Sequence, residues 1–375
     1  MNRSRRSQTP VDAVRWPGSS VARERSAAAT FPARVRIFQA VRNEWLATGS
    51  ACGAFEWIAM GYLAVTSVLV SVLSENLTHP VRLLATRACV VALMILLCRG
   101  TDILAGSETR FSIYTLKFWH FWRHWYPHLF FLFCFEELAR LVHLVSPRWQ
   151  DTKLIAFDYW LTGVHPAAWL EQFATPVRND FMQFTYITYF AYLLVLGGIL
   201  YYRKDWLGYW SVMTYSAVAY ATGYLVAIAF PIESPWFSMA GSWHGELQGG
   251  PFTALINFIE HYGRVRGAAF PSEHVAGSFA ALWGAWRHRR WLFWVMLPLV
   301  LCMCVSTVYG RYHYVADIFG GVTTGTLGYF IGGWLMRTTN TQPMRSARVA
   351  AQQVAPVSSR ACQAKRGEGP QKIFS

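Results

Sequence analysis

Charged residues are scarce in this sequence. Only 14% of its 375 residues are Asp, Glu, Lys or Arg, whereas 54% are hydrophobic and 16% are aromatic. A soluble domain usually has about a quarter of its residues charged. The 18 Trp, 18 Tyr and 25 Phe are typical of helices in a bilayer, where such rings collect at the two interfaces. The composition therefore argues against a water-soluble globular domain.

Cysteine spacing and the N-terminal segment exclude two further kinds of protein. Most of the seven cysteines lie in or beside apolar runs, and none is spaced from a histidine as metal ligands are. They predict neither a disulfide framework nor a metal site. The N-terminus is not a secretory signal, because about fifty mostly polar residues precede the first apolar run.

The net charge of +14 is concentrated toward the two ends of the chain. Residues 1–50 and 337–375 are rich in Arg together with Ser, Ala, Gln and Pro, a composition that predicts disordered arms. Because they flank apolar runs, we interpret them as cytoplasmic anchors beside anionic membrane lipids. No nucleic-acid-binding fold is apparent, so we expect no nucleic acid partner.

Apolar runs close to the ~20 residues needed to cross a bilayer recur along the chain. We therefore expect an all-α, polytopic membrane helical bundle with about eight transmembrane helices, the shortest of which starts at His274. The expected helices are Ala54–Leu73, Val81–Cys98, Tyr126–Val145, Phe181–Tyr202, Leu207–Phe230, His274–Trp286, Trp291–Tyr309 and Tyr314–Met336.

The distribution of Lys and Arg predicts the orientation of the bundle. Basic residues in the loops Arg99–Trp125, Arg203–Asp205 and Arg287–Arg290 favour the cytoplasm. The long loops Ser146–Asp180 and Pro231–Ser272 then lie outside. We expect the membrane to be a bacterial inner membrane, with the outer loops in the periplasm.

The two long outer loops differ in composition. Apolar and aromatic residues mixed with acids between Ser146 and Asp180 predict short amphipathic helices at the membrane interface. The loop Pro231–Ser272 is rich in Gly and Pro and has no clear helical period after Met239. We interpret this second loop as a binding lid, because long structureless loops in compact domains are usually functional.

Histidines at the outer ends of two apolar runs point to phosphoryl transfer. His313 and Asp317 are four residues apart, so on a helix they share one face. The carboxylate can accept the proton of one ring nitrogen and leave the other nitrogen free to attack. His274, from another helix, can protonate the leaving oxygen as general acid.

Candidate phosphate-binding groups lie close to these histidines in the sequence. The guanidinium groups of Arg311, Arg266 and Arg264 suit the oxygens of a phosphoryl group. Ser272 and nearby backbone N–H groups offer further donors at the start of a helix. For Arg311, a helix cap or a lipid headgroup contact is the alternative interpretation.

The segment Pro271-Ser272-Glu273-His274, followed by His313-x-x-x-Asp317, resembles the type-2 phosphatidic acid phosphatase superfamily. The superfamily consensus is Pro-Ser-Gly-His and Ser-Arg-x5-His-x3-Asp. Within the superfamily, the chain looks closest to the branch of inositol phosphorylceramide synthases. Three segments carry this likeness: the residues around His313, Trp125-Tyr126-Pro127, and the segment that starts at Phe230-Pro231. The resemblance covers about residues 122–334.

The resemblance implies a six-helix core over residues 122–336, preceded by two extra transmembrane helices in residues 51–121. It implies that His313 is the nucleophile, that Asp317 orients it, and that a phosphohistidine intermediate passes its phosphoryl group to water or to a lipid alcohol acceptor. The superfamily needs no metal, and we expect no cofactor. The implied substrate is a lipid phosphate such as phosphatidic acid, a polyprenyl diphosphate or a phosphoinositol donor.

The sequence departs from the consensus at three points. Glu273 replaces the usual Gly, Thr307 replaces the usual Arg six residues before the nucleophile, and the upstream Lys-x6-Arg-Pro element has no match. Arg311 and Arg266 are the candidates for the missing phosphate contacts. These departures keep open an alternative in which the chain is a non-catalytic lipid-phosphate carrier or scaffold.

Other ionisable residues of the apolar runs are interpreted as structural. Glu136 and Glu137 with Arg140 are expected to form a buried structural pair, and Glu56, Arg82 and Arg87 either to snorkel to the interface or to form interhelical contacts.

Overall fold

The computed structural model describes residues 52–106, 113–263 and 265–339. This part of the chain forms twelve α-helices, two short 3-10 helices and no β-strand, which confirms the predicted all-α class. The elements are α3 (Ala54–Val72), η1 (Ser74–Asn76), α4 (Pro80–Gly106), α5 (Ile113–Leu141), α6 (Asp151–Thr162), α7 (Pro166–Glu171), α8 (Pro176–Tyr202), α9 (Trp206–Ala229), α10 (Pro235–Ser238), η2 (Ala240–Ser242), α11 (Pro251–Gly263), α12 (Glu273–His288), α13 (Arg290–Tyr309) and α14 (Val315–Thr339). The basic arms and Arg264 lie outside the described residues.

Each of the eight apolar runs corresponds to a helix in the structure. Five of these helices are long and apolar enough to cross a membrane by length and composition, namely α3, α4 over Pro80–Gly100, α8, α9 and α13. The protein is therefore a multi-pass membrane protein. α12 has only 16 residues and packs against α8, α9, α13 and α14, so neighbouring helices surround it.

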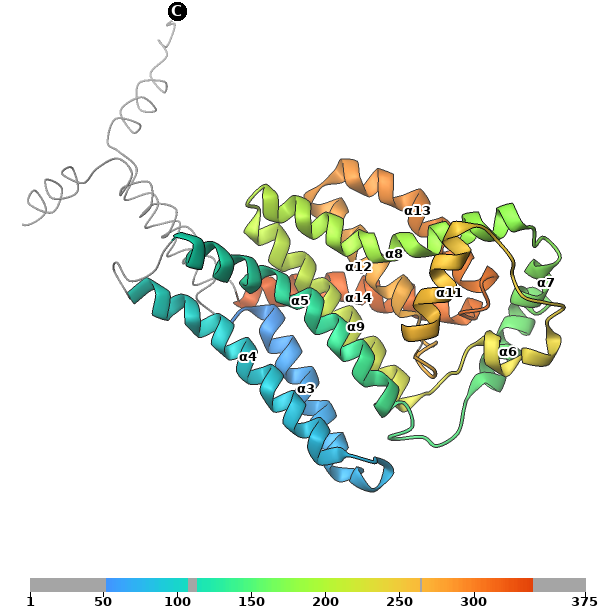
Figure 1. The fold of residues 1–375 in the computed structure, drawn as a ribbon, viewed down its shortest axis with the longest axis horizontal. Helices are drawn as coiled ribbons and strands as arrows, with labels where there is room; N and C mark the ends of the chain where they lie inside the picture. Colours follow the sequence, from blue (N-terminus) through green and yellow to red (C-terminus); the bar gives the residue numbers. More distant parts are fainter. Residues whose placement is uncertain (1–51, 107–112, 264, 340–375) are drawn as a thin grey trace, which may run out of the picture.

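Helices α9 and α12 form the centre of the bundle (Figure 1). α9 is buried along most of its length and contacts α3, α5, α8, α12 and α14. The hairpin α3–α4 and helix α5 lie together on one side of this centre, and α8 and α13 lie on the other. Because α9 contacts both α3 and α12, the hairpin is packed onto the same core as the histidine-bearing helix.

Glycines on α14 bring this helix close to α12 and α9. A Cβ atom at Gly321 would lie 2.6 Å from the carbonyl oxygen of Ser272, the N-cap of α12, and one at Gly325 would lie 2.5 Å from the carbonyl oxygen of Ala276 in α12. Gly328 and Gly332 face α9 in the same way, each with a Cβ position too close to Tyr215. Small residues at such spacing let helix backbones approach closely in membranes. These four glycines therefore let α14 pack closely on α12 and α9, and Gly321 places the start of α14 beside the start of α12.

Buried ion pairs connect the first hairpin to α5. Arg87 of α4 pairs with both carboxylate oxygens of Glu137 at 2.9 Å, and Arg123 pairs with Glu56 of α3 at 2.9 Å. The predicted pairing of Glu137 with Arg140 is therefore wrong, because the carboxylate turns toward the neighbouring helix instead of along its own. Of the two interpretations left open for Glu56, the structure supports the interhelical contact. Removing one partner of a buried pair typically costs roughly 3–5 kcal/mol.

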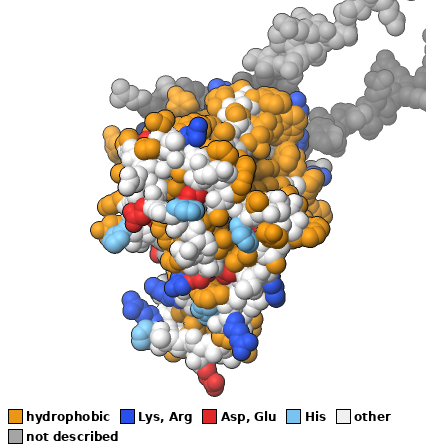
Figure 2. Space-filling view, turned by 90° about the vertical axis from the view of Figure 1, so that its right-hand side faces the viewer, with side chains coloured by type: hydrophobic (Ala, Val, Ile, Leu, Met, Phe, Trp, Pro, Cys, Tyr) orange, Lys and Arg blue, Asp and Glu red, His pale blue; other side chains and the backbone are white. Residues whose placement is uncertain are grey.

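Short helices cover one end of the bundle, where α6, α7 and α11 lie (Figure 1). Figure 2 views this end and shows scattered charged groups beside a broad apolar surface along one side. The predicted short helices between Ser146 and Asp180 are present as α6 and α7. The prediction of no helix after Met239 is wrong, because Pro251–Gly263 forms α11. The expected loop Arg99–Trp125 is also largely helical, since α4 continues to Gly106 and α5 starts at Ile113.

Candidate active site

The candidate nucleophile lies in a tight turn between α13 and α14. Gly310 ends α13, and the backbone of Arg311 adopts φ 65°, a left-handed conformation that is uncommon for a residue with a side chain. The N–H groups of Tyr312 and His313 both donate to the carbonyl oxygen of Thr307, at 3.0 and 3.1 Å. Thr307 thus holds this turn through its backbone at the position where the consensus has an arginine.

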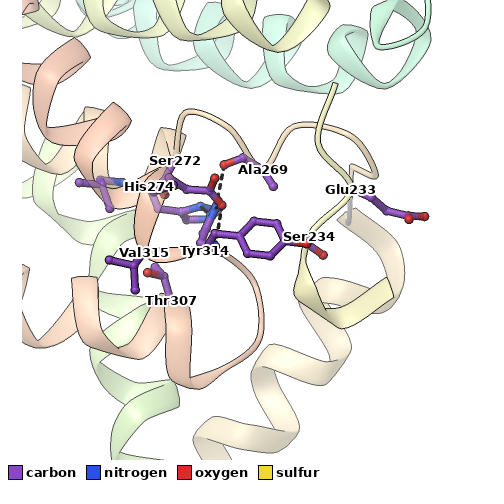
Figure 3. A network of polar contacts seen from close by, with 12 residues as sticks. Glu233, Ser234, Ala269, Ser272, His274, Thr307, Tyr314 and Val315 are labelled. Atoms are coloured by element: carbon purple, nitrogen blue, oxygen red, sulfur yellow. Dashed lines mark hydrogen bonds and ion pairs between the residues drawn. The ribbon is translucent and has the colours of Figure 1, made fainter. Parts of the chain in front are cut away.

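Two acceptors fix the ring of His313. Its Nδ1 lies 2.9 Å from the carbonyl oxygen of Ala269 and 3.2 Å from Oδ2 of Asp317. Both neighbours accept hydrogen bonds only, so Nδ1 carries the proton and Nε2 has a free lone pair. His313 Nε2 in turn lies 3.2 Å from Nδ1 of His274. Figure 3 shows this cluster at the point where the histidine turn meets the start of α12.

Asp317 joins the starts of two helices. Its Oδ2 also accepts from the N–H of Tyr314 at 2.7 Å, and its backbone carbonyl accepts from the N–H of Ser272 at 3.0 Å. The side chain is completely buried. His313 precedes the first residue of α14, so the contact closes across the first turn instead of along a continuous helix. The four-residue spacing still brings the two side chains together.

The second histidine is held between tyrosines of α8. Nε2 of His274 lies 2.9 Å from the hydroxyl of Tyr186, and the ring centroids of Tyr186 and Tyr189 are 4.9 and 4.7 Å from that of His274. The neutral His274 ring with its proton on Nδ1 donates to His313 and accepts from Tyr186. No sequence pattern points to these tyrosines, because α8 lies far from His274 in the chain, with Tyr186 88 residues away.

The position of Ala269 depends on a second loop. Ala269 N–H donates to the carbonyl oxygen of Ile232 at 3.2 Å, beside an isolated β-bridge between Ile232 and Ala268. The loop that contains Ile232 is fixed by Asp151 of α6, which accepts from the N–H groups of Glu233 and Ser234 at 3.0 and 3.2 Å. The position of the Ala269 carbonyl oxygen, which accepts from His313, therefore depends on contacts that extend to Asp151 of α6.

Asp158, another α6 carboxylate, caps α14. It accepts from the N–H groups of Val315 and Ala316 at 2.8 and 3.0 Å, which are otherwise unsatisfied donors of the first helical turn. Burial raises the pKa of Asp158, and these two donors lower it. Sequence reasoning missed Asp151 and Asp158; their seven-residue spacing, which places both on one face of a helix, was the available signal.

A cavity of about 430 Å³ opens beside the two histidines. His274 and His313 line one part of it, and most of the remaining wall comes from apolar and aromatic side chains of α5, α8 and α9. α11 contributes Ile259, Glu260 and Gly263. A mostly apolar pocket with a few converging polar groups is the usual form of a lipid or small-molecule site.

Arg311 does not line this cavity. Its guanidinium donates to Glu171 of α7 at 2.9 Å and lies 4.4 Å from the ring centroid of Trp243 and 5.8 Å from that of Trp236. Burial lowers the pKa of Arg311, and Glu171 raises it. The side chain thus lies behind the histidine turn, among the outer loops.

Arg266 lies at the rim of the cavity. It forms an ion pair with Glu233, a lining residue, and its guanidinium lies 4.7 Å from the ring centroid of Phe237. Its side chain remains 57% exposed. Figure 3 shows Glu233 pointing away from the histidine cluster. Arg264, which lies between two lining residues in the sequence, is outside the described residues.

Ser272 caps the helix that carries His274. Its hydroxyl accepts from the N–H of Val275 at 3.4 Å, and the residue is completely buried. The next residue, Glu273, occupies the position of the consensus glycine, and its buried carboxylate lines the cavity. The structure therefore brings His313, Asp317 and His274 together, whereas the side chain of Ser272 acts as a helix cap.

Fold and site together define a helical membrane protein with a His–His–Asp cluster beside an apolar cavity. The comparison with protein families agrees with this description: residues 152–331, from α6 into α14, match the family model of the PAP2 superfamily. Over this segment, which is slightly less than half of the chain, the sequence is similar to that superfamily, and the match supports a phosphatase-type activity on lipid phosphates in general. No curated protein and no solved structure matches the chain.

Proposed function

We propose that the protein is an integral-membrane lipid phosphate phosphatase or phosphotransferase that works through a phosphohistidine at His313. One observation carries the proposal. His313 Nδ1 faces two acceptors, Ala269 O and Asp317 Oδ2, while Nε2 faces His274 beside the cavity. This arrangement provides an unprotonated ring nitrogen next to a second titratable ring, as nucleophilic catalysis requires.

The reaction proceeds in two steps. The lone pair of His313 Nε2 attacks phosphorus, and the bond from phosphorus to the leaving oxygen breaks. His274, which enters this step as an imidazolium after taking up a proton together with the substrate, gives the leaving oxygen a proton and becomes neutral. Asp317 stabilises the positive charge that the His313 ring acquires. In the second step His274 takes a proton from water or from an acceptor hydroxyl, whose oxygen attacks phosphorus and releases His313.

Binding of the phosphoryl oxygens is assigned to Arg311, Arg266 and Ser272. Each arginine is held by a carboxylate, Arg311 by Glu171 and Arg266 by Glu233. Both arginines lie on outer loops, so a substrate phosphate competes with these carboxylates for the guanidinium groups. The hydroxyl of Ser272 accepts from its own helix and still has a proton to donate.

We place the protein in a bacterial inner membrane with the cavity facing the periplasm. The supporting observation is the clustering of basic residues in the opposite loops. Gly245, exposed on the outer loop, is a suitable position for a test, since a side chain there meets no neighbouring atom. A Gly245→Cys variant should react with a membrane-impermeant thiol reagent in cells with a permeabilised outer membrane. Protection until the inner membrane is lysed would reverse the orientation.

We also propose a domain division, which the superfamily match over residues 152–331 supports. The core extends over residues 122–336 and belongs with the inositol phosphorylceramide synthase-like branch in our proposal, and residues 51–121 contribute the additional hairpin. Because α5 runs through residues 121 and 122, we move the start of the core to Ile113. A core that starts at Ile113 should keep its activity if the hairpin only stabilises it.

Phosphate release by the detergent-purified protein tests the activity. A panel of lipid phosphates is offered without added metal, with lipid alcohols and inositol lipids in parallel reactions. Release should fall by roughly 10³-fold or more in His313→Ala, and remain in His143→Ala, which removes an exposed histidine just after the end of α5. Equal release from both variants would contradict the assignment of His313.

A non-catalytic lipid-phosphate binding protein is the second candidate. The observation that favours it is the pairing of Arg311 and Arg266 with carboxylates, which leaves no free described guanidinium at the cavity. Binding of lipid phosphates without product from any donor and acceptor combination would establish this second function.

A further inference from the structure

The carboxylate of Glu273 is buried without a protein partner in the described part of the chain. Only 4% of the residue is exposed, and neither carboxylate oxygen has a hydrogen-bond partner there. Glu273 lines the same cavity as His274 and His313. A carboxylate removed from water costs several kcal/mol unless a cation or hydrogen-bond donors compensate for it.

The neighbouring helix leaves room for this carboxylate. A Cβ atom at Gly223 of α9 would overlap the carboxylate of Glu273, so the acid lies directly against the α9 backbone. Any side chain at position 223 would displace it. The close approach fixes the carboxylate at one wall of the cavity.

Aromatic rings form the wall around Glu273. Tyr220 and Tyr224, on either side of Gly223 in the sequence, stack with centroids 5.9 Å apart, and Phe131 lies 4.9 Å from Tyr220. The hydroxyls of Tyr189 and Tyr220 are 3.0 Å apart, and the Tyr189 ring also contacts His274. All of these residues line the cavity. Aromatic faces attract organic cations, most strongly where water is excluded.

The described lining of the cavity is acidic. It contains the carboxylates of Glu136, Glu233, Glu260 and Glu273, and no lysine or arginine. Among the residues the structure describes, no group of three histidine, cysteine or acidic side chains is arranged to hold a metal ion. The combination of one desolvated carboxylate with several rings fits an ammonium group better than a metal ion.

We propose that Glu273 and the rings around it bind an ammonium group of the substrate while the phosphate lies at His313. The inference rests on the proposed function and names its substrate class, a lipid phosphate whose polar part carries an ammonium group close to the phosphate. Glu273 and His274 are consecutive residues, and both line the cavity that His313 also lines. An amino alcohol phosphate carries the ammonium group and the phosphate only a few bonds apart, whereas a phosphate without an amine leaves the carboxylate unpaired.

The test uses two single-chain lipid phosphates of equal length, one with an amine beside the phosphate and one without it. The wild-type protein should show a kcat/KM for the amine lipid higher by roughly tenfold or more. In Glu273→Gln, which keeps the shape and removes the charge, this ratio should fall to about one. Glu136→Gln is the matched control, because it removes an exposed carboxylate of the same cavity on α5.

A wild-type ratio near one, or a ratio that Glu273→Gln does not change, would overturn the ammonium site and leave the phosphatase assignment intact. A preference for a hydroxyl-bearing lipid over the amine lipid would also overturn it, in favour of a neutral hydrogen-bonding acid. If neither lipid is hydrolysed, the proposed function fails, and lipid-dependent thermal stabilisation decides the inference separately. Stronger stabilisation of the wild type by the amine lipid, lost in Glu273→Gln, supports the site, and equal stabilisation by both lipids refutes it.

Discussion

Two buried carboxylates lie in the first turns of neighbouring helices, Asp317 on α14 and Glu273 on α12. Oδ2 of Asp317 is held by His313 Nδ1 and by the N–H of Tyr314. Glu273 has no described hydrogen-bond partner for either oxygen. The two acids are therefore alike in burial and differ in what neutralises them.

The difference separates the two parts of the candidate site. Around Asp317, protein groups orient His313 through hydrogen bonds to its Nδ1 atom. Asp158 in turn caps the first turn of α14, the helix that carries Asp317. Around Glu273 the protein supplies space and aromatic surface and leaves the charge for a ligand. In the proposed mechanism, the groups that act on the phosphate are therefore held in place by the protein, whereas the group proposed to select the lipid has no protein partner among the described residues.

The largest effect is expected from Asp317→Asn. This change keeps the size of the side chain but removes the charge that stabilises the His313 ring and its tautomer. Turnover should fall by roughly 10²- to 10⁴-fold in kcat, measured as phosphate release. If Glu273→Gln lowered turnover of every lipid just as much, the contrast between the two acids would be lost.

A smaller effect is expected from Arg311→Ala, compared with Glu171→Gln. If Arg311 contacts the substrate phosphate, its removal should raise KM by roughly 10- to 100-fold, because a charge-assisted hydrogen bond is lost. Glu171→Gln frees the guanidinium and should leave KM unchanged or lower. Equal losses of stability and no change in KM for either variant would show that the pair only ties the outer loops together.

Asp158→Ala should act through the position of α14. The two N–H groups of its first turn lose their acceptor, which costs roughly 1 kcal/mol of stability by analogy with helix caps. The melting temperature in detergent should fall, and kcat should fall with it because the histidine turn loosens. Asp158→Asn retains an acceptor oxygen and should restore most of both; failure of this rescue would argue against the capping role.

The smallest effect on stability is expected from Glu273→Gln in the absence of lipid. No protein contact is lost and the desolvation cost of the charge disappears, so the melting temperature should stay the same or rise slightly. A fall of several degrees in differential scanning fluorimetry would mean that the carboxylate has a structural partner. The comparison with Asp317 would then need revision.

The sequence predicted the helical class and the central cluster, because both depend on local patterns. Apolar runs show helices of membrane length, and the spacing of His313 and Asp317 predicts their contact. The acceptor from Ala269 and the cap from Asp158 depend on loops that meet only in the folded chain, and no periodicity reports them. Helix α11 was missed because a Gly- and Pro-rich stretch precedes its short apolar repeat. Glu137 was assigned to Arg140 because the partner on another helix, Arg87, is 50 residues away.

The most direct test of the central role of His313 is to trap the phosphoryl group on the protein. Purified protein is mixed with a lipid phosphate labelled in the phosphoryl group and quenched within milliseconds in alkali, in which phosphohistidine is stable. The account predicts an acid-labile label on the peptide that contains His313, absent from His313→Ala. Turnover without any labelled protein, or a label on another residue, would contradict it.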